Sequence, residues 1–274
     1  MSEILLIGEI NLDIFIILKE NKTHTKNYLV KIGGTTLNIA KSLKYLGINP
    51  VIFSHIGKDL IGKGIYDELS KDFNLSLIQR NDLTNIILYF IKNDKFEVIG
   101  LKKESPLFRI DEDFLKFYRD VKVVHISPYI FLRKENYDFF EKIKDENKIF
   151  IINLSMPILD NQKFTKILNG IDYIFMNLEE GKKLVKKDDL FKIKIFLKEN
   201  FKNSVLTLPN GIYFLNKEKE IFIEVEKIHK KINIGSGDYL LGGFIYGLSK
   251  NLKIEDSLNI GLESVKNYLN SFKI

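Results

Sequence analysis

The chain is organised around the stretch Asn233-Ile234-Gly235-Ser236-Gly237-Asp238-Tyr239-Leu240-Leu241-Gly242-Gly243-Phe244. Gly235 and Gly237 can adopt backbone angles closed to other residues, so that successive N–H groups can point into one concavity. The apolar residues that follow predict a helix over about 238–249, and the first N–H groups of a helix favour an anion. Asp238 would repel phosphate, but a carboxylate there could accept the proton of an attacking hydroxyl group. The alternative is an N-capping loop with an ordinary first-turn acid, because short Gly-x-Gly strings are common.

The composition predicts a chain with a sizeable core and no membrane partner. Apolar residues make up 45% of the chain, yet no run approaches the roughly 18 uninterrupted apolar residues of a membrane span. The start of the chain has no basic segment ahead of its apolar run, so it is interpreted as a first strand and not as a secretory signal. Cysteine is absent, which excludes disulfides and thiolate metal sites and fits a reducing compartment. We therefore expect a cytoplasmic protein.

The charge pattern argues against nucleic acid as a partner. The net charge is +6, from 42 basic and 36 acidic residues. The lysines are scattered through predicted helices, as in Lys182, Lys183, Lys186 and Lys187, and are not gathered into an Arg-rich stripe with interleaved aromatic residues. Solvated helical faces explain this arrangement, so we expect no nucleic-acid binding.

Apolar runs and amphipathic segments alternate along most of the chain. Buried strands are expected at residues 3–8, 51–54, 121–126, 149–153, 173–176 and 205–208. Helices are expected after residue 35, after residue 59, from about 135, and at 162–168, 179–185, 190–201, 238–249 and 255–270. Such alternation predicts a largely parallel sheet with helices on both faces. No repeat, low-complexity tract or linker divides the chain, so a single domain over residues 1–274 is predicted.

Two regions depart from this alternation. Residues 86–91 and 95–100 are rich in β-formers and are separated by Lys92-Asn93-Asp94, which indicates a hairpin. Residues 20–31 are polar and are expected to form a loop. A hairpin inserted between α/β units suggests a lid that lies off the main sheet, and lid elements are predicted at about 10–32 and 84–102.

Two polar groups early in the chain are candidates for ligand contacts. Asn11 and Asp13 alternate with apolar residues and therefore share one face of a strand, which either lines a cleft or is the wet face of an edge strand. Gly33 and Gly34 would let a ligand approach the backbone, while Asn38 could bind its hydroxyl groups. A capping role is the alternative for Asn38.

Four separated strings resemble the ribokinase-like, PfkB-type carbohydrate kinase family, in the family's order and at similar spacing over essentially the whole chain. They are Gly33-Gly34…Asn38-Ile39-Ala40, Gly57-Lys58-Asp59…Gly62, Asn177-Leu178-Glu179-Glu180 and Gly235-Ser236-Gly237-Asp238…Gly242-Gly243-Phe244. The resemblance implies an α/β three-layer sandwich, with a mostly parallel central sheet flanked by helices and a small β lid. It also implies an ATP-dependent phosphotransferase that phosphorylates a hydroxymethyl group of a sugar, with Mg²⁺.

The resemblance implies roles for individual residues. Asp238 is the base that takes the proton from the acceptor hydroxyl, and the amides of Gly235, Ser236 and Gly237 form the anion hole for the γ-phosphate. Acceptor hydroxyls are bound by Asn11, Asp13, Gly33, Gly34 and Asn38. The nucleotide contacts are Asn177, Thr207, Gly211 and Gly237. Glu180 holds Mg²⁺ through water, with an ordinary helix-surface carboxylate as the alternative.

Three departures from the family pattern affect these implied roles. The nucleotide loop, Thr207-Leu208-Pro209-Asn210-Gly211, is one residue shorter than in the family and contains a proline. The Asp-Thr-x that usually precedes the glycine loop is Ile232-Asn233-Ile234 here, and little sequence follows the last predicted helix. In many relatives these last two segments bind an activating K⁺, so we expect activity without activation by a monovalent cation. Lid hairpins of the family often pair between subunits, which suggests a homodimer, although Lys92 and Lys95 could also protect the edge.

Two other functions are compatible with the sequence, and a third is excluded. Asn153-Leu154-Ser155-Met156-Pro157 resembles a segment of adenosine-kinase-like members, which gives a nucleoside kinase as the alternative acceptor class. The altered nucleotide loop also allows a catalytically inactive sugar- or nucleotide-binding relative. A Rossmann-type dehydrogenase is excluded, because Ile7-Gly8-Glu9-Ile10 lacks the Gly-x-Gly-x-x-Gly fingerprint after the first strand.

Overall fold

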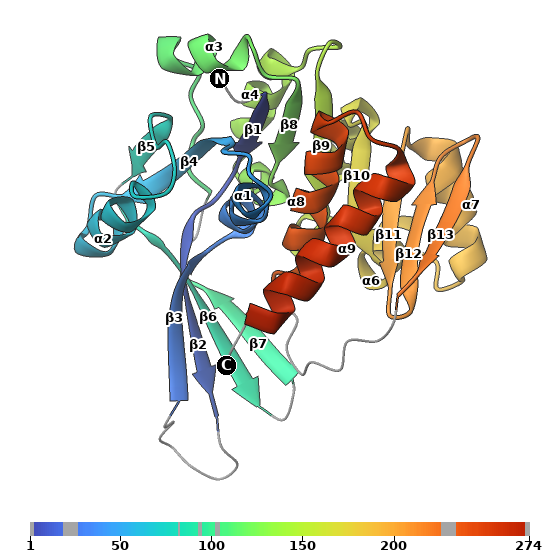
Figure 1. Ribbon diagram of the computed structural model, residues 1–274, viewed down its shortest axis with the longest axis horizontal. Helices are drawn as coiled ribbons and strands as arrows, with labels where there is room; N and C mark the ends of the chain where they lie inside the picture. Colours follow the sequence, from blue (N-terminus) through green and yellow to red (C-terminus); the bar gives the residue numbers. More distant parts are fainter. Residues whose placement is uncertain are drawn as a thin grey trace.

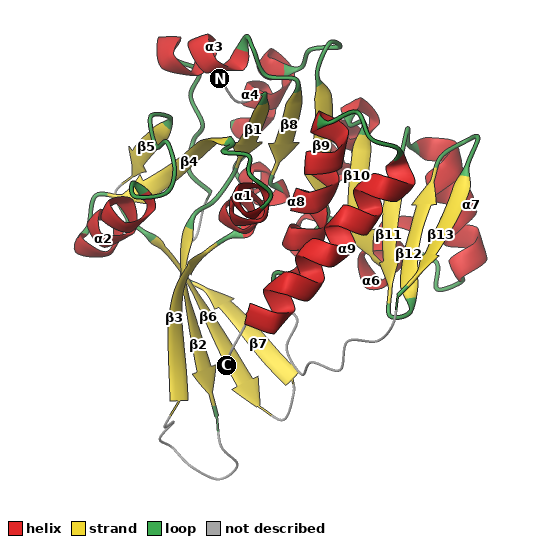
Figure 2. Cartoon of the chain, viewed as in Figure 1, coloured by secondary structure: helices red, strands yellow, loops and turns green. Residues whose placement is uncertain are grey.

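The computed structural model describes residues 3–18, 27–81, 83–92, 95–101, 105–225 and 234–271. Within these residues the chain forms a main sheet of nine strands, a small sheet of four strands and nine α-helices (Figures 1 and 2). None of the helices in these ranges is both long and apolar enough to cross a membrane.

The main sheet is parallel apart from one edge. In spatial order its strands are β13 (Glu220–Glu224), β12 (Gly211–Leu215), β11 (Ser204–Leu208), β10 (Tyr173–Asn177), β9 (Ile149–Asn153), β8 (Val123–Ile126), β1 (Ile4–Ile7), β4 (Val51–Gly57) and β5 (Ile78–Asn81). In this order, every pairing from β11 across to β5 is parallel, whereas β12 pairs antiparallel with both β11 and β13. The predicted largely parallel sheet is therefore confirmed.

Helices cover both faces of the main sheet. One face is covered by α1 (Thr35–Tyr45), α2 (Leu60–Leu69), α8 (Ser236–Ser249) and α9 (Ile254–Ser271). The other face is covered by α3 (Glu112–Tyr118), α4 (Asn136–Ile143), α5 (Gln162–Ile167), α6 (Leu178–Val185) and α7 (Leu190–Asn200). The result is a three-layer α/β sandwich, as predicted.

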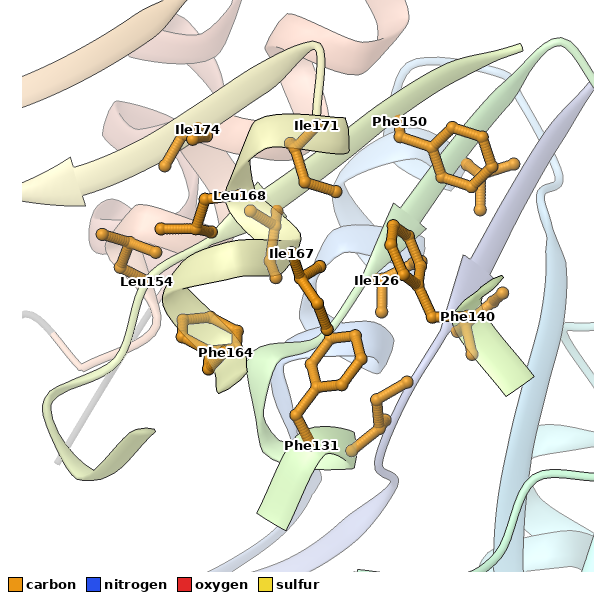
Figure 3. Packing of buried hydrophobic residues seen from close by; sticks show 14 of the residues in the cluster. Ile126, Phe131, Phe140, Phe150, Leu154, Phe164, Ile167, Leu168, Ile171 and Ile174 are labelled. Carbon is orange, nitrogen blue, oxygen red and sulfur yellow. The ribbon is translucent and has the colours of Figure 1, made fainter. Parts of the chain in front are cut away.

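Two large hydrophobic clusters lie on opposite faces of the main sheet, and a small third cluster forms around Phe15 and Ile91 of the small sheet. Strand β1 shows the period of two: Leu5 and Ile7 pack into one cluster, and Ile4 and Leu6 into the other. The cluster below α4 and α5 is rich in phenylalanine, and Figure 3 shows Phe131 between Phe140 and Phe164. Central strands such as β1 and β8 are therefore buried on both faces, as is usual in a parallel sheet.

The small sheet lies off the main sheet (Figure 1). Its strands, in spatial order, are β3 (Asn27–Gly33), β2 (Asn11–Ile17), β6 (Asn85–Lys92) and β7 (Lys95–Gly100). The predicted hairpin is present as β6 and β7, although its turn at 93–94 lies outside the described residues. The predicted loop at 20–31 is wrong where the structure describes it, because residues 27–31 pair with β2 as part of β3. As an edge strand, β3 exposes Asn27 and Tyr28, and this polarity resembles that of a loop.

The segment Gly57-Lys58-Asp59…Gly62 connects α2 to the small sheet. The Asp59 carboxylate accepts hydrogen bonds from the Gly62 N–H (2.7 Å), the Thr84 N–H (2.7 Å) and the Thr84 hydroxyl (2.6 Å). A Cβ at Gly57 would lie 2.3 Å from the Thr84 nitrogen, so glycine is needed there. Asp59 therefore caps α2 and at the same time fixes the residue before strand β6.

Helices α8 and α9 pack through glycine. A Cβ at Gly243 would lie 2.6 Å from the Gly261 Cα, and a Cβ at Gly261 would lie 2.5 Å from the Leu240 carbonyl oxygen. The two backbones are therefore in direct contact, which fixes α8 against α9. Because α8 begins with the turn that contains Asp238, this contact also fixes the position of that turn.

Candidate active site

A cavity of about 980 Å³ lies between the small sheet and the N-terminal ends of α1 and α8. Its size is at the upper end of the usual range for small-molecule sites. The predicted site residues that line it are Asn11, Asp13, Gly33, Gly34, Asn38, Glu180, Gly235 and Asp238. The fold thus brings together residues from four distant parts of the chain.

Asp238 lies in the first turn of α8 and faces residues of α1. Its Oδ2 accepts a hydrogen bond from the Asn38 Nδ2 at 2.9 Å, and the Thr35 hydroxyl also bonds to the carboxylate. Burial raises the pKa of Asp238 to about 6, while the two hydrogen bonds oppose this shift. A carboxylate of this kind is ionised at neutral pH and is more basic than an exposed aspartate.

The turn before Asp238 presents backbone N–H groups. Gly235 is the N-cap of α8 with a φ of 85°. Of the hydrogen bonds among described residues, none engages the N–H of Ser236 or Gly237, whereas the Asp238 N–H donates to the Gly235 carbonyl. The prediction of special backbone angles is confirmed for Gly235 and wrong for Gly237, which is helical. A Cβ at Gly237 would have no atom within 4 Å, so glycine at this position leaves the surface of the turn without a side chain.

Asp13 lies against the backbone of the two early glycines. A Cβ at Gly33 would lie 1.9 Å from the Asp13 Oδ2, and the Gly34 N–H donates to the Asp13 carboxylate. Gly34 has a φ of 97°, and a Cβ there would lie 2.6 Å from the Glu9 carbonyl oxygen. Gly33 is thus required for Asp13 to occupy this place, and Gly34 is required by its positive φ and by the nearby Glu9 carbonyl.

The Asp13 carboxyl is buried and only partly satisfied. Its Oδ1 has no hydrogen-bond partner among the described residues. Burial raises the pKa of Asp13 to about 7, nearby Lys41 lowers it and Asp238 raises it further. An unpartnered carboxylate oxygen in the wall of a cavity is suited to accept a hydrogen bond from a ligand hydroxyl. On the neighbouring strand, the Asn85 Nδ2 donates to the Asn11 Oδ1 at 2.5 Å, which orients the Asn11 amide in the same wall.

Asn177 and Glu180 form a capping box at the start of α6. The Glu180 N–H donates to the Asn177 Oδ1 at 2.9 Å, and the Asn177 N–H donates to the Glu180 Oε2 at 2.8 Å. Only Glu180 lines the cavity. Burial raises the pKa of Glu180 to about 7, and nearby Asp238 raises it further.

The carboxylates of the cavity fit a magnesium ion that is held mostly by water and phosphate. Among the described residues no group of three or more His, Cys, Asp or Glu side chains could hold a metal. Mg²⁺ is commonly bound by one or two carboxylates together with water and substrate phosphates. Glu180 is one carboxylate of this cavity that such an ion would stabilise, because burial and the neighbouring Asp238 raise its pKa.

The predicted nucleotide residues Asn177, Thr207 and Gly211 lie outside the cavity wall. Asn177 and Thr207 are register partners at the ends of β10 and β11, so they are adjacent. Strand β11 turns into β12 through Pro209 and Asn210, with Leu208 paired to Gly211. A Cβ at Gly211 would lie 2.4 Å from the Phe222 ring, so packing already explains this glycine. The nucleotide roles of these residues stay predictions.

Several site residues were not identified from the sequence. Thr35 bonds to Asp238, and Lys41 lines the cavity one helical turn beyond Asn38. A pattern in the sequence does indicate that these residues lie together, because Thr35, Asn38 and Lys41 recur at the spacing of one helical face. A polar stripe on a helix normally indicates a face exposed to solvent, and here it faces a cavity.

Tyr268 of α9 supports the turn before α8. Its hydroxyl donates to the Ile234 carbonyl at 2.7 Å, and its ring stacks on Tyr239 with ring centroids 4.0 Å apart. It also packs with Phe15 and Ile91 of the small sheet. Figure 1 shows α9 running from the main sheet toward the small sheet, where this contact is made.

Comparison with known proteins relates the chain to carbohydrate kinases. A model of the pfkB family carbohydrate kinases matches residues 1–264. The chain is 25% identical over 281 residues to an ATP-dependent 6-phosphofructokinase from Thermoanaerobacterium thermosaccharolyticum, with 94% of this chain and 85% of the relative covered.

Solved structures share the fold. The fructokinase of Halothermothrix orenii superimposes with a TM-score of 0.80 at 22% identity, covering 99% of this chain and 100% of that one. The adenosine kinase of Sinorhizobium meliloti gives a TM-score of 0.83 at 16% identity, covering 97% and 93%. The sandwich with its additional small sheet is thus the fold of these proteins.

Proposed function

The chain belongs to the pfkB family of carbohydrate kinases, and we propose that it transfers the γ-phosphoryl group of ATP to a hydroxymethyl group of a sugar. The observation that carries the proposal is the position of Asp238. Its carboxylate lies in the cavity wall, is held by Asn38 and Thr35, and adjoins a helix N-terminus with uncovered N–H groups.

In the proposed reaction, Asp238 accepts the proton of the acceptor hydroxyl as that oxygen attacks the γ-phosphorus. The bond to the β-phosphate oxygen breaks and ADP leaves. The N–H groups of Gly235, Ser236 and Gly237 stabilise the negative charge on the transferred group. Asp13 accepts a hydrogen bond from a second acceptor hydroxyl, and Asn11 contributes its amide. These residues supply orientation, which accounts for much of the catalysis of phosphoryl transfer.

Mg²⁺, when bound with ATP, would neutralise charge on the phosphate oxygens, and Glu180 is the carboxylate that would hold it through water. The nucleotide is assigned to the ends of β10 and β11, beside Asn177, Thr207 and Gly211. The small sheet, over about residues 10–32 and 84–102, is proposed to be the lid of a single domain. A lid that excludes water protects the transferred group from hydrolysis.

The proposed function is tested by measuring ADP release with Mg-ATP over a panel of sugars and nucleosides. We expect turnover with a sugar. Turnover on a nucleoside alone would favour the alternative, for which the structure offers one supporting observation: Phe15 and Tyr89 stack at 4.5 Å in the cavity wall, where they could contact a base. Binding without any turnover would identify an inactive relative.

The raised pKa values predict loss of activity at acid pH. A carboxyl with a pKa of about 6 is ionised above that pH and protonated below it, so kcat/KM for the acceptor should fall as the pH decreases through 6. Asn38→Ala removes a hydrogen bond that lowers the pKa of Asp238, so its acid limb should move to higher pH. Asn85→Ala, which removes an amide bonded to Asn11, should leave the limb in place. An unshifted limb in Asn38→Ala would contradict the assignment.

Activity is expected without activation by a monovalent cation. The Ile234 carbonyl, just ahead of the proposed anion hole, accepts a hydrogen bond from Tyr268. The segments around residues 226–233 and 272–274 lie outside the described residues. Initial rates should agree in K⁺, Na⁺ and tetramethylammonium buffers of equal ionic strength at saturating Mg-ATP. A several-fold increase specific to K⁺ would show that the prediction is wrong.

We also propose that the lid pairs two copies of the chain. The outer face of the small sheet carries a row of apolar register partners, Val30, Ile14, Leu88 and Ile99. Val30 and Ile99 are 46% and 47% exposed. An apolar row across an exposed sheet commonly marks an interface.

Sedimentation velocity tests this pairing. The wild type should sediment as a dimer, and the double variant Val30→Lys with Ile99→Lys should sediment as a monomer. Leu60→Lys serves as the control, because Leu60 is 89% exposed on α2 and does not belong to the apolar row of the small sheet. A monomeric wild type at tens of micromolar, or a dimer that survives the double variant, would refute the proposal.

A further inference from the structure

Two lysines lie beside Asp13 in the cavity wall. Lys31 is the cross-strand register partner of Asp13 in the pairing of β3 with β2. Lys41 lies on α1, three residues beyond Asn38, so the two side chains project from the same side of the helix. Both lysines line the cavity and are half-buried.

The described residues neutralise the Lys41 ammonium only in part. Its Nζ donates to the Ile32 carbonyl at 2.6 Å, which leaves two of its three donors unused among the described residues. It forms no ion pair with a described carboxylate, although Asp13 is close enough to raise its pKa. Burial and the charge of Lys31 lower that pKa to about 8, so Lys41 is still mostly protonated at neutral pH. Lys44, one turn further along α1, is by contrast paired with Asp72.

The proposed base Asp238, the Asp13 carboxyl and the two lysines all line the same cavity. Asn38 bonds to Asp238, and Lys41 follows Asn38 by three residues, a rise of about 4.5 Å along the helix. Asp13 lies within electrostatic range of both Lys41 and Asp238. Asp13, whose Oδ1 has no hydrogen-bond partner among the described residues, is thus near the proposed base, near Lys41 and opposite Lys31. A ligand that presents one hydroxyl to Asp238 and another to Asp13 would extend toward Lys31 and Lys41.

We propose that the acceptor is an anionic sugar, a phosphate ester or a sugar acid, whose charged group binds Lys31 and Lys41. The inference rests on the proposed kinase function and specifies the acceptor of the same site. Two neighbouring ammonium groups repel each other, and an anion between them removes that cost and accepts the unused Lys41 donors. A neutral sugar or a nucleoside would leave those donors in a partly buried wall without a partner.

The test compares neutral and charged acceptors in matched pairs. Acceptor-dependent ADP release is measured for fructose against fructose 6-phosphate, ribose against ribose 5-phosphate, and glucose against gluconate, with adenosine as the nucleoside. The favoured acceptor should be a charged member, with kcat/KM at least about 10-fold above its neutral parent. The phosphate and carboxylate pairs together show which anion is used.

The variants assign the preference to the lysines. Lys41→Met should raise KM for the charged acceptor by about 10–100-fold and lower kcat much less, because charge-assisted hydrogen bonds are lost. Lys31→Met should act in the same direction, and KM for ATP should stay within about twofold in both. Lys44→Met, on the same helix but outside the cavity, should behave like the wild type.

The experiments distinguish a wrong assignment of the anionic acceptor from a wrong assignment of the kinase function. Turnover that is best on a neutral acceptor, or a Lys41→Met variant that affects neutral and charged acceptors equally, overturns the inference and leaves the kinase function intact. If no acceptor gives ADP, the kinase function fails. In that case, calorimetric titration compares the binding of fructose 6-phosphate and of fructose to the protein. Equal affinity for the two sugars refutes the inference, and so does a Lys41→Met variant that binds fructose 6-phosphate as tightly as the wild type.

Discussion

Replacing Asp238 with asparagine is expected to reduce kcat by about 10²–10⁴-fold, because the amide keeps the shape of the carboxylate and cannot accept the proton. Binding of ATP and acceptor should change little, since the Asn38 amide can still donate to the oxygen of the new side chain. The measurement is steady-state kinetics together with calorimetric titration of each ligand.

Asp256→Asn is the matched control for this variant. Asp256 lies in the first turn of α9, the neighbouring long helix, so its replacement removes a comparable helix-terminal charge. Its kinetics should match those of the wild type. If Asp238→Asn retains near-normal turnover, or if both variants lose activity equally, Asp238 is not the base.

Gly243→Ala is expected to destabilise the fold strongly. The added Cβ would lie 2.6 Å from the Gly261 Cα and 2.8 Å from the Ile260 carbonyl oxygen. Backbone atoms cannot move aside as a flexible side chain can, so α8 and α9 must separate. Overpacking of this kind costs about 1–3 kcal/mol, and the melting temperature should fall by several degrees.

Gly64→Ala, by contrast, is expected to stabilise the fold. Gly64 lies on the exposed side of α2, and a Cβ there would meet nothing within 4 Å. Alanine should therefore stabilise the chain by about 0.5–1 kcal/mol, through its better helix propensity. Thermal unfolding of both variants by circular dichroism makes the comparison. A Gly243→Ala protein as stable as the wild type would show that the contact between α8 and α9 can relax.

The sequence predicts the parts of the fold in which local pattern and burial agree. Buried parallel strands such as Ile149–Asn153 are short apolar runs, and the structure places β9 at those residues. Strand β3 was predicted as loop, because its Lys31 and Asn27 make an edge strand resemble one. Helix α3, capped by Asp111, was not predicted, because it is short and Phe114 is its one fully buried residue.

For the site, residue identities are more predictable than contacts. Glycine strings indicate where the backbone must come close: Gly33 makes room for Asp13, and Gly34 makes room for the Glu9 carbonyl. The hydrogen bond between Asn38 and Asp238 joins residues 200 positions apart, and no local pattern specifies it. Lys41 was missed for a related reason, since a helical stripe does not reveal whether it faces water or a cavity.

Identification of the product is the most direct test of phosphoryl transfer to a sugar. Wild-type protein incubated with Mg-ATP and the preferred sugar should yield a sugar phosphate ester by mass spectrometry, in a one-to-one ratio with ADP. Asp238→Asn, measured in parallel, should yield about 10²–10⁴-fold less of both. ADP formation that does not depend on the sugar, or an equal yield from Asp238→Asn, would contradict phosphoryl transfer to a sugar hydroxyl with Asp238 as the base.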